Sequence, residues 1–330
     1  MRAALGAVSD RTLNRTIIGL GLVLVIGLPT VGLLYVFDRH VDPGLPMAER
    51  AIAAGEAAIR TEPNKLSNRL QLAAAYAAGS RLRDAINQYA EVLRVDPGNR
   101  IALLGRADGY VSLGDLEAAA RDYQALVDLA EDTEMAKVDP QLEAAYFGLG
   151  SIALRQDRPR DAATLLANAL TINGTDADAL NLMGTALLRI DDAQGAIDAL
   201  RDAIALVPVG WCEPYTQLAD AYTATNDATG TQYATGMVAL CEKRPVEAER
   251  LLEPLVDGPY SRDALIGLGL TAEDRGDREA AVSLYSRVYA TDPTDFDAIT
   301  GLNRLGAGAA TASPGPDATP TTSTTSPGPR

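Results

Sequence analysis

The sequence contains very little histidine and cysteine, and this scarcity limits the chemistry that it can support. Of its 330 residues, one is a histidine (His40) and two are cysteines (Cys212 and Cys241). A metal site built from several histidines or thiolates is therefore excluded, as is a small fold held together by many disulfides. Aromatic residues make up only 5% of the chain. This favours close-packed helices over a β-sandwich, because strands are enriched in aromatic side chains.

Positive charge is also scarce. The chain has 29 Lys and Arg against 44 Asp and Glu, which gives a net charge of −15 and a pI of about 4.5. Proteins that bind nucleic acid need a basic face for the phosphates. We therefore expect no nucleic-acid partner.

No motif in the sequence points to catalysis. Residues 267–272 (GLGLTA) imitate a dinucleotide-binding fingerprint, but that fingerprint follows a strand, whereas this run follows a loop. A glycine-rich phosphate loop ending in G-K-S or G-K-T is absent from the sequence. We expect no enzyme, no cofactor and no metal ion.

One long uncharged run occupies residues 16–37. As a helix its 22 residues would measure about 33 Å, enough to cross the hydrocarbon core of a bilayer. A cleaved signal peptide is the alternative, but the run is longer than such an apolar region and lacks a small-residue cleavage site after it. Three arginines precede the run, so the positive-inside rule places residues 1–15 in the cytoplasm and the rest of the chain outside. The sequence thus predicts a single-pass membrane protein anchored in the lipid bilayer through 16–37.

The other end of the chain has a different composition. Residues 306–330 are rich in Pro, Thr and Ser and contain no aliphatic side chain larger than that of alanine. Such a segment cannot bury enough apolar surface to offset the entropy of ordering. It is predicted to be a disordered tail, either a spacer or a frayed end.

Between these segments the sequence repeats itself every 34 residues. Ala51, Ala85 and Ala119 are spaced by 34 residues, as are Gly150 and Gly184. Turn motifs accompany the period: Gly-Asp at 114–115 and again at 276–277, each followed by Ala-Ala and a tyrosine. Asp-Pro pairs at 96–97 and 292–293 and a Val-Pro pair at 207–208 each end a second helix, because proline cannot continue a helix.

Period, turns and prolines together resemble tetratricopeptide-repeat (TPR) proteins over about residues 47–305. The resemblance implies an all-α, superhelical TPR solenoid of about six helix–turn–helix repeats at 45–305. Small residues at Gly150, Gly184 and Gly269 would let the helices of each pair approach closely.

The repeat pattern is interrupted in two places. Nine extra residues fall at 131–140, and the step from Ala196 to Ala248 is about half a repeat too long. Helices are expected at 212–225 and 229–242, the second serving both as the end of one pair and as the start of the next. The solenoid is therefore predicted to be irregular near 212–260. A lone helix at 47–62 and a short cap at 296–304 are expected at its ends.

In TPR proteins the first helices line a concave face where a peptide or helix binds. The resemblance implies that a partner would lie across twelve residues of this chain, unless some of them contact neighbouring helices instead: Leu70, Ala74, Leu104, Asp108, Phe147, Ser151, Leu154, Arg155, Asn181, Thr185, Leu188 and Arg189. The basic and Asn pairs that clamp a C-terminal carboxylate in some TPR co-chaperones are not found at these positions.

The two cysteines lie equally far from the turn near Asn226 and Asp227. In an antiparallel helical hairpin, Cys212 and Cys241 would therefore fall at the same end of the pair. An oxidising compartment outside the cytoplasm would favour a disulfide between them. The alternative is two free cysteines that act as small apolar residues.

These features predict a bacterial, membrane-anchored scaffold or assembly factor that binds one or more proteins or peptides outside the cytoplasm. A membrane-anchored TPR protein of this form resembles accessory factors of cytochrome c maturation, envelope biogenesis and secretion. An alternative role is therefore a regulatory or substrate-delivery subunit of an envelope enzyme or of the cytochrome c maturation machinery. Self-assembly through the solenoid is a third hypothesis.

Overall fold

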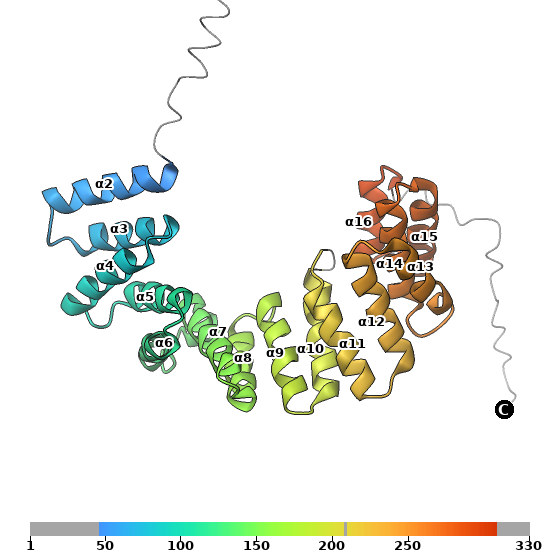
Figure 1. Ribbon diagram of the computed structural model, residues 1–330, viewed down its shortest axis with the longest axis horizontal. Coiled ribbons are helices and arrows are strands. Elements are labelled where there is room, and N and C mark those ends of the chain that lie inside the picture. The colour runs from blue at the N-terminus through green and yellow to red at the C-terminus, as the bar shows by residue number, and fades with distance from the viewer. Residues whose placement is uncertain (1–45, 208–209, 309–330) are drawn as a thin grey trace, which may run out of the picture. The chain divides into compact units, whose positions relative to one another are not determined.

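The computed structural model describes residues 46–207 and 210–308, which form fifteen α-helices, two short 3-10 helices (η) and no strand (Figure 1). In chain order the helices are α2 (Met47–Thr61), α3 (Leu66–Ala78), α4 (Leu82–Val95), α5 (Arg100–Leu113), α6 (Leu116–Ala130), η1 (Ala136–Val138), α7 (Pro140–Arg155), α8 (Pro159–Ile172), α9 (Ala177–Arg189), α10 (Ala193–Leu206), α11 (Glu213–Ala224), α12 (Ala228–Cys241), α13 (Pro245–Leu252), η2 (Glu253–Leu255), α14 (Ser261–Asp274), α15 (Arg278–Thr291) and α16 (Phe296–Arg304). The predicted cytoplasmic segment 1–15, the anchor 16–37 and the tail from residue 309 onward lie outside the described residues. None of the helices within 46–207 and 210–308 is both long enough and apolar enough to cross a membrane.

The chain divides into two compact units at Glu91, within α4. In the first unit, the lone helix expected at 47–62 is confirmed as α2, which packs against α3. Tyr76 of α3 donates its hydroxyl proton to Glu56 at 2.9 Å, and Asn68 donates to the carbonyl oxygen of Ala58 at 3.2 Å. These bonds hold α2 against α3, although α2 is a lone helix and not one half of a helical pair.

In the second unit the helices pack as successive pairs, α5 with α6, α7 with α8, α9 with α10 and α14 with α15. Aspartates begin many of these helices. Asp115, Asp192 and Asp277 each accept a hydrogen bond from a backbone N–H in the first turn of the helix that follows, which satisfies a donor that a helix start otherwise leaves unpaired. The predicted all-α architecture of stacked helix pairs is therefore confirmed.

The turn inside each pair contains one residue with a positive φ. Gly114 and Gly276 fill this position in two pairs, and Asp191 and Asn226 fill it in two others. Lys243 has the same conformation, with φ at 59°, between α12 and α13. The turns before and after α12 are thus both of the kind that joins two helices of one pair.

Helix α12 consequently belongs to two pairs. It packs against α11 before it and against α13 after it, and it also contacts α14 in the way that first helices contact one another. The helices predicted at 212–225 and 229–242 correspond to α11 and α12. This shared helix accounts for the half-repeat and for the irregularity predicted near 212–260.

In the pairs α7–α8 and α9–α10, a side chain of the second helix rests on the backbone of the first. A Cβ atom added at Gly150 would lie 2.7 Å from Cγ of Leu166, and one added at Gly184 would lie 2.5 Å from Cγ of Leu200. Both leucines are completely buried. The small residues predicted at these positions are therefore required by close helix contact.

We expect Gly184→Ala to lower the free energy of unfolding by about 1–2 kcal/mol, because overpacking at this contact outweighs the better helix propensity of alanine. Gly98→Ala is the control, since its added Cβ would meet nothing closer than 3.9 Å. Urea denaturation followed by circular dichroism measures both variants. Equal midpoints for the two variants would show that Leu200 can move aside.

Polar bonds also connect the first helices of neighbouring pairs. In each case a side chain of one first helix bonds the residue that precedes the next first helix. Arg100 of α5 is paired with Asp139, and Glu143 of α7 bonds with Asp176. The second contact joins two carboxyl groups. Burial, and then the bond to Asp176 and its charge, raise the pKa of Glu143 to about 7. Its Oε1 atom is buried without a hydrogen-bond partner among the described residues.

This pair predicts a pH dependence of stability. The pKa of Glu143 is raised above its ordinary value of 4.5, so its stabilising contribution is complete below that value and is lost as pH rises through about 7. We expect the free energy of unfolding to fall by ~1–2 kcal/mol between pH 5 and pH 8, less than the full shift implies because the group is partly solvated. Denaturation of Glu143→Gln, whose amide still donates to Asp176, should lack this component. An identical pH profile in the variant would contradict the assignment.

Candidate binding groove

Several of the residues predicted to line the concave face are buried or bonded to neighbouring helices. Asn181 is buried, with 4% of its surface exposed, and its Oδ1 accepts a bond from Gln217 of α11 at 3.3 Å. The hydroxyl of Thr185 donates to the same glutamine at 2.9 Å. Leu154 is also buried. The expectation that Asn181 and Leu154 face an open groove is wrong, because adjacent first helices pack side by side and cover them.

Other predicted residues are partly engaged by the protein. Phe147 and Leu188 are half-buried and pack against the core. Arg189 donates from Nη1 to the carbonyl oxygen of Leu154 at 2.9 Å, and exposed Asp108 accepts the hydroxyl proton of Tyr123. The remaining predicted residues divide by exposure: Leu70, Leu104 and Ser151 are half-buried, whereas Ala74 and Arg155 are exposed. None of the predicted residues lines the groove described next.

The second unit contains two adjoining pockets, each of about 410 Å³. Both are lined by Tyr215, Met237, Leu270 and Arg304. We call the two pockets together the α14 groove, because one face of α14 follows them from end to end. That face consists of Arg262, Asp263, Ile266, Leu270, Glu273 and Asp274.

The floor of the groove is apolar and the walls come from helices on either side. Tyr215 and Leu218 of α11, Met237 of α12 and Ile266 of α14 form much of the floor. Helix α10 contributes Arg201, Ile204 and Ala205 to one wall, and α16 contributes Phe296, Asp297, Thr300 and Arg304 to another. All of these elements belong to the second unit.

Phe296 is the most exposed large apolar side chain of the groove, with 73% of its surface open to solvent. It is the first residue of α16, and Asp295 before it accepts a bond from the backbone N–H of Ala298 at 2.9 Å. This cap fixes the start of the helix and with it the backbone position of Phe296 at the groove wall. An exposed aromatic on a concave surface is typical of a binding site.

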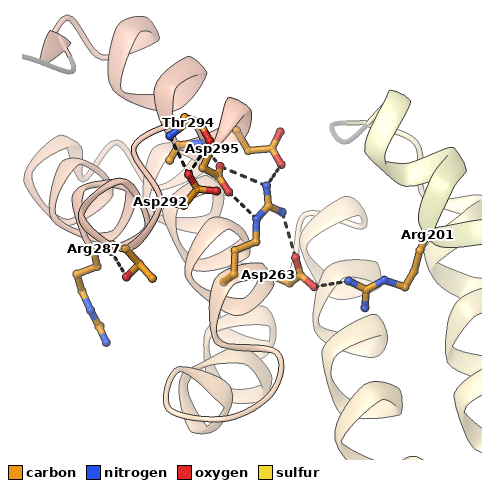
Figure 2. Close-up of polar contacts among 10 residues, drawn as sticks. Arg201, Asp263, Arg287, Asp292, Thr294 and Asp295 are labelled. Atoms are coloured by element: carbon orange, nitrogen blue, oxygen red, sulfur yellow. Dashed lines mark hydrogen bonds and ion pairs between the residues drawn. The ribbon is translucent and has the colours of Figure 1, made fainter. Parts of the chain in front are cut away.

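Arginines lie beside carboxylates of low exposure at one end of the groove: the side chains of Asp263, Asp295 and Asp297 are 14%, 7% and 20% exposed. Figure 2 shows Asp263 between Arg201 on one side and the turn of Asp292, Thr294 and Asp295 on the other. Arg201 is 3.3 Å from Asp263 and also donates to the hydroxyl of Tyr222 at 3.2 Å.

Arg262 occupies the centre of this network. It bonds Asp263 at 3.0 Å, Asp295 at 2.8 Å and Asp297 at 2.5 Å. Burial works to lower the pKa of Arg262, but these bonds raise it overall. The guanidinium is therefore charged at every accessible pH, and it ties α14 to α16.

At the other end of the groove, Arg304 makes a two-point contact with Glu273. Its Nε and Nη2 atoms donate to the two carboxylate oxygens at 2.8 and 2.5 Å. Burial acts to raise the pKa of Glu273, but the bonds from Arg304 and Tyr285 hold it below its usual value. Lys243 is paired with Asp274 at 2.8 Å on the same side.

Sequence reasoning missed this groove because it placed the binding face on the regular repeats. The half-repeat near 212–260 predicts an irregularity of the solenoid and does not by itself predict a binding site. The recurrence of Arg262, Ile266 and Leu270 at helical spacing, with Arg304 near the end of the solenoid, was the signal that the sequence offered.

The two cysteines lie at the same end of the α11–α12 pair, Cys212 just before α11 and Cys241 at the end of α12. Both are free in the structure, which therefore does not contain the predicted disulfide. Burial, and then the adjacent Cys212 side chain, raise the pKa of Cys241 to about 12. A thiol with this pKa is a poor nucleophile at neutral pH. The two side chains are thus neighbours, while the covalent bond stays a prediction.

The described part of the chain holds no cluster of potential metal ligands. Across 46–207 and 210–308, no three His, Cys, Asp or Glu side chains are placed so that they could hold a metal ion.

A family model described as "Tetratricopeptide repeat" matches residues 70–133, 145–210 and 233–296, more than half of the chain. The third match begins within α12 and so treats this helix as the start of a repeat.

Similar proteins include the "DnaJ protein P58IPK homolog A" of Oryza sativa subsp. japonica, which is 29% identical over 131 residues. That match covers 36% of this chain and 26% of the relative, so the chain spans about a quarter of the length of this curated relative. Among solved structures, the MamA protein is 22% identical with a TM-score of 0.45, covering 58% of this chain and 94% of that one. MamA from Desulfovibrio magneticus RS-1 is 17% identical with a TM-score of 0.48, covering 55% and 96%.

We expect a disulfide between Cys212 and Cys241 in protein isolated from its native cells without reductant. Closing this 30-residue loop should stabilise the fold by on the order of 3–4 kcal/mol in the chain-entropy estimate, less any strain. Mass spectrometry after alkylation without reductant checks the bond, and Cys212→Ala should leave Cys241 alkylatable. Two alkylated thiols in the unreduced wild-type protein would overturn the prediction.

Proposed function

Because the chain belongs to the tetratricopeptide-repeat family, we propose that it is a scaffold or assembly factor that binds protein partners through the α14 groove. The observation that carries this proposal is the combination of an apolar floor with a largely exposed aromatic side chain, Phe296, at its wall. The floor side chains are themselves nearly buried, so Phe296 supplies most of the apolar area that a partner would cover. Burying this apolar surface against a partner stabilises the complex, because apolar surface in contact with water is unfavourable.

The proposal includes a place in the cell. The uncharged run at 16–37 and the three arginines before it support a single membrane anchor with a cytoplasmic N-terminus. The repeats at 45–305 then act outside the cytoplasm. In this role the protein is not an enzyme: it holds partners at the membrane surface.

One labelling experiment tests both the groove and its location. In a Cys212→Ala, Cys241→Ala background, a single cysteine is introduced as Phe296→Cys or as Val246→Cys. Val246 lies on α13 outside the α14 groove and is 76% exposed, which matches the 73% exposure of Phe296. Intact cells whose outer layer admits the reagent are treated with a membrane-impermeant maleimide.

We expect Val246→Cys to react in intact cells and Phe296→Cys to react several-fold more slowly, because a partner covers the groove. After detergent extraction and washing in salt, the two rates should become similar. If neither variant reacts before lysis, the extracytoplasmic location is wrong. Equal rates in the native membrane would mean that the groove is empty. A catalytic chain found on the protected protein would identify the role as a regulatory or substrate-delivery subunit.

A further inference from the structure

The ion pairs of the α14 groove share one arrangement: the cation is more exposed than its carboxylate partner. The side chain of Arg201 is 47% exposed above Asp263 at 14%, and that of Arg304 is 44% exposed above Glu273 at 18%. Arg262 and Lys243 are likewise more exposed than the carboxylates that they contact. The guanidinium and ammonium groups therefore present a larger part of their surface to an approaching molecule than the carboxylates that line the same pockets.

These cations are grouped at the two ends of the groove. Arg201 and Arg262 share Asp263 near the start of α14, whereas Arg304 and Lys243 contact Glu273 and Asp274 at its end. Arg262 and Glu273 are eleven residues apart on one helix, which corresponds to about 16 Å at 1.5 Å per residue. Between the two ends the lining is apolar, with Ile266 and Leu270 of α14 beside Met237.

We propose, on the basis of the proposed function, that the α14 groove binds a protein segment with carboxylate side chains at both ends of an apolar stretch, about 16 Å apart. A helix would place such side chains eleven residues apart, and an extended chain would place them about five apart at 3.3 Å per residue. The apolar stretch lies on the floor and against Phe296. The carboxylates accept hydrogen bonds from the N–H groups that Arg201 and Arg304 do not use within the protein. Every nitrogen of Arg262 already donates to Asp263, Asp295 or Asp297.

The overall charge of −15 does not oppose this partner at close range. At physiological ionic strength the Debye length is about 8 Å, so carboxylates on distant helices are screened from a ligand in the groove. At close range the cations and their carboxylate partners nearly cancel in charge, so the greater exposure of the cations decides which charge a ligand meets.

The first test is a selection from a library of random 16-residue peptides displayed on phage, using the full-length protein in a lipid nanodisc. Selected peptides are then measured against Phe296→Ala, with Val246→Ala as the exposed control outside the groove. We expect the selected peptides to contain pairs of Asp or Glu flanking apolar residues, and to lose about fivefold or more in affinity with Phe296→Ala only.

The outcomes separate the two proposals. Peptides that depend on Phe296 but carry basic or uncharged ends would overturn the acidic partner and leave the groove as a binding site. Peptides that bind Phe296→Ala as well as the wild type, or a selection that yields no binder, would overturn the binding groove itself and this inference with it.

A second measurement tests the arginines directly. Arg201→Gln removes one exposed cation while Asp263 keeps its bond to Arg262 at 3.0 Å, so the fold should not change. Arg250→Gln removes the same charge from an exposed position on α13 and is the matched control. The affinity of an acidic selected peptide should fall about fivefold with Arg201→Gln and remain unchanged with Arg250→Gln. A control peptide in which Asn and Gln replace Asp and Glu should bind the wild type and Arg201→Gln with equal affinity. Equal losses for the two arginine variants would contradict the proposal.

Discussion

Close contact between the backbone of one helix and a buried side chain of the next supports the whole second unit. Leu166 rests on Gly150, Leu200 on Gly184 and Leu252 on Gly236, with no room for a Cβ atom between them. Because dense packing transmits any displacement, each pair has a fixed spacing, and the following pair can then stack on it. A residue with positive φ in each turn, such as Asn226 or Lys243, lets the chain reverse within a few residues.

The same contact explains how α12 can serve two pairs. It meets α11 on one side, and on another its Gly236 receives Leu252 of α13, as Gly184 receives Leu200 of α10. Helix α12 therefore packs as the second helix of one pair and as the first helix of the next. The stack continues to α14 and α16 after only half a repeat. The α14 groove lies where this change occurs, since α11, α12 and α14 all contribute to its floor. An irregular repeat thus produces this concave surface.

Charge in the groove is organised by depth. Carboxylates such as Asp295 and Glu273 lie beneath and hold helix starts or neighbouring tyrosines, while Arg262 and Arg304 lie above them. A long arginine side chain can cover apolar surface with its stem and keep its charged group in water. The groove is therefore nearly neutral in total charge, although the surface that a partner meets is cationic.

The sequence by itself determined the helices and their pairing. Period and turn residues are local signals, so the lone helix α2, the neighbours α11 and α12, the cap α16 and the glycine contacts could be predicted from spacing alone. Counting residues from the turn also placed Cys212 and Cys241 at one end of their pair.

Only the tertiary structure decided which side chains remain free. Asn181 and Leu154 have the spacing of concave-face residues, yet the next first helix covers them, because burial depends on how neighbouring repeats stack and not on periodicity within one helix. For the same reason the α14 groove, with lining residues as far apart in the chain as Arg201 and Arg304, could not be predicted from local pattern. The placement of each guanidinium above its carboxylate requires contacts between separate helices, which no spacing rule contains.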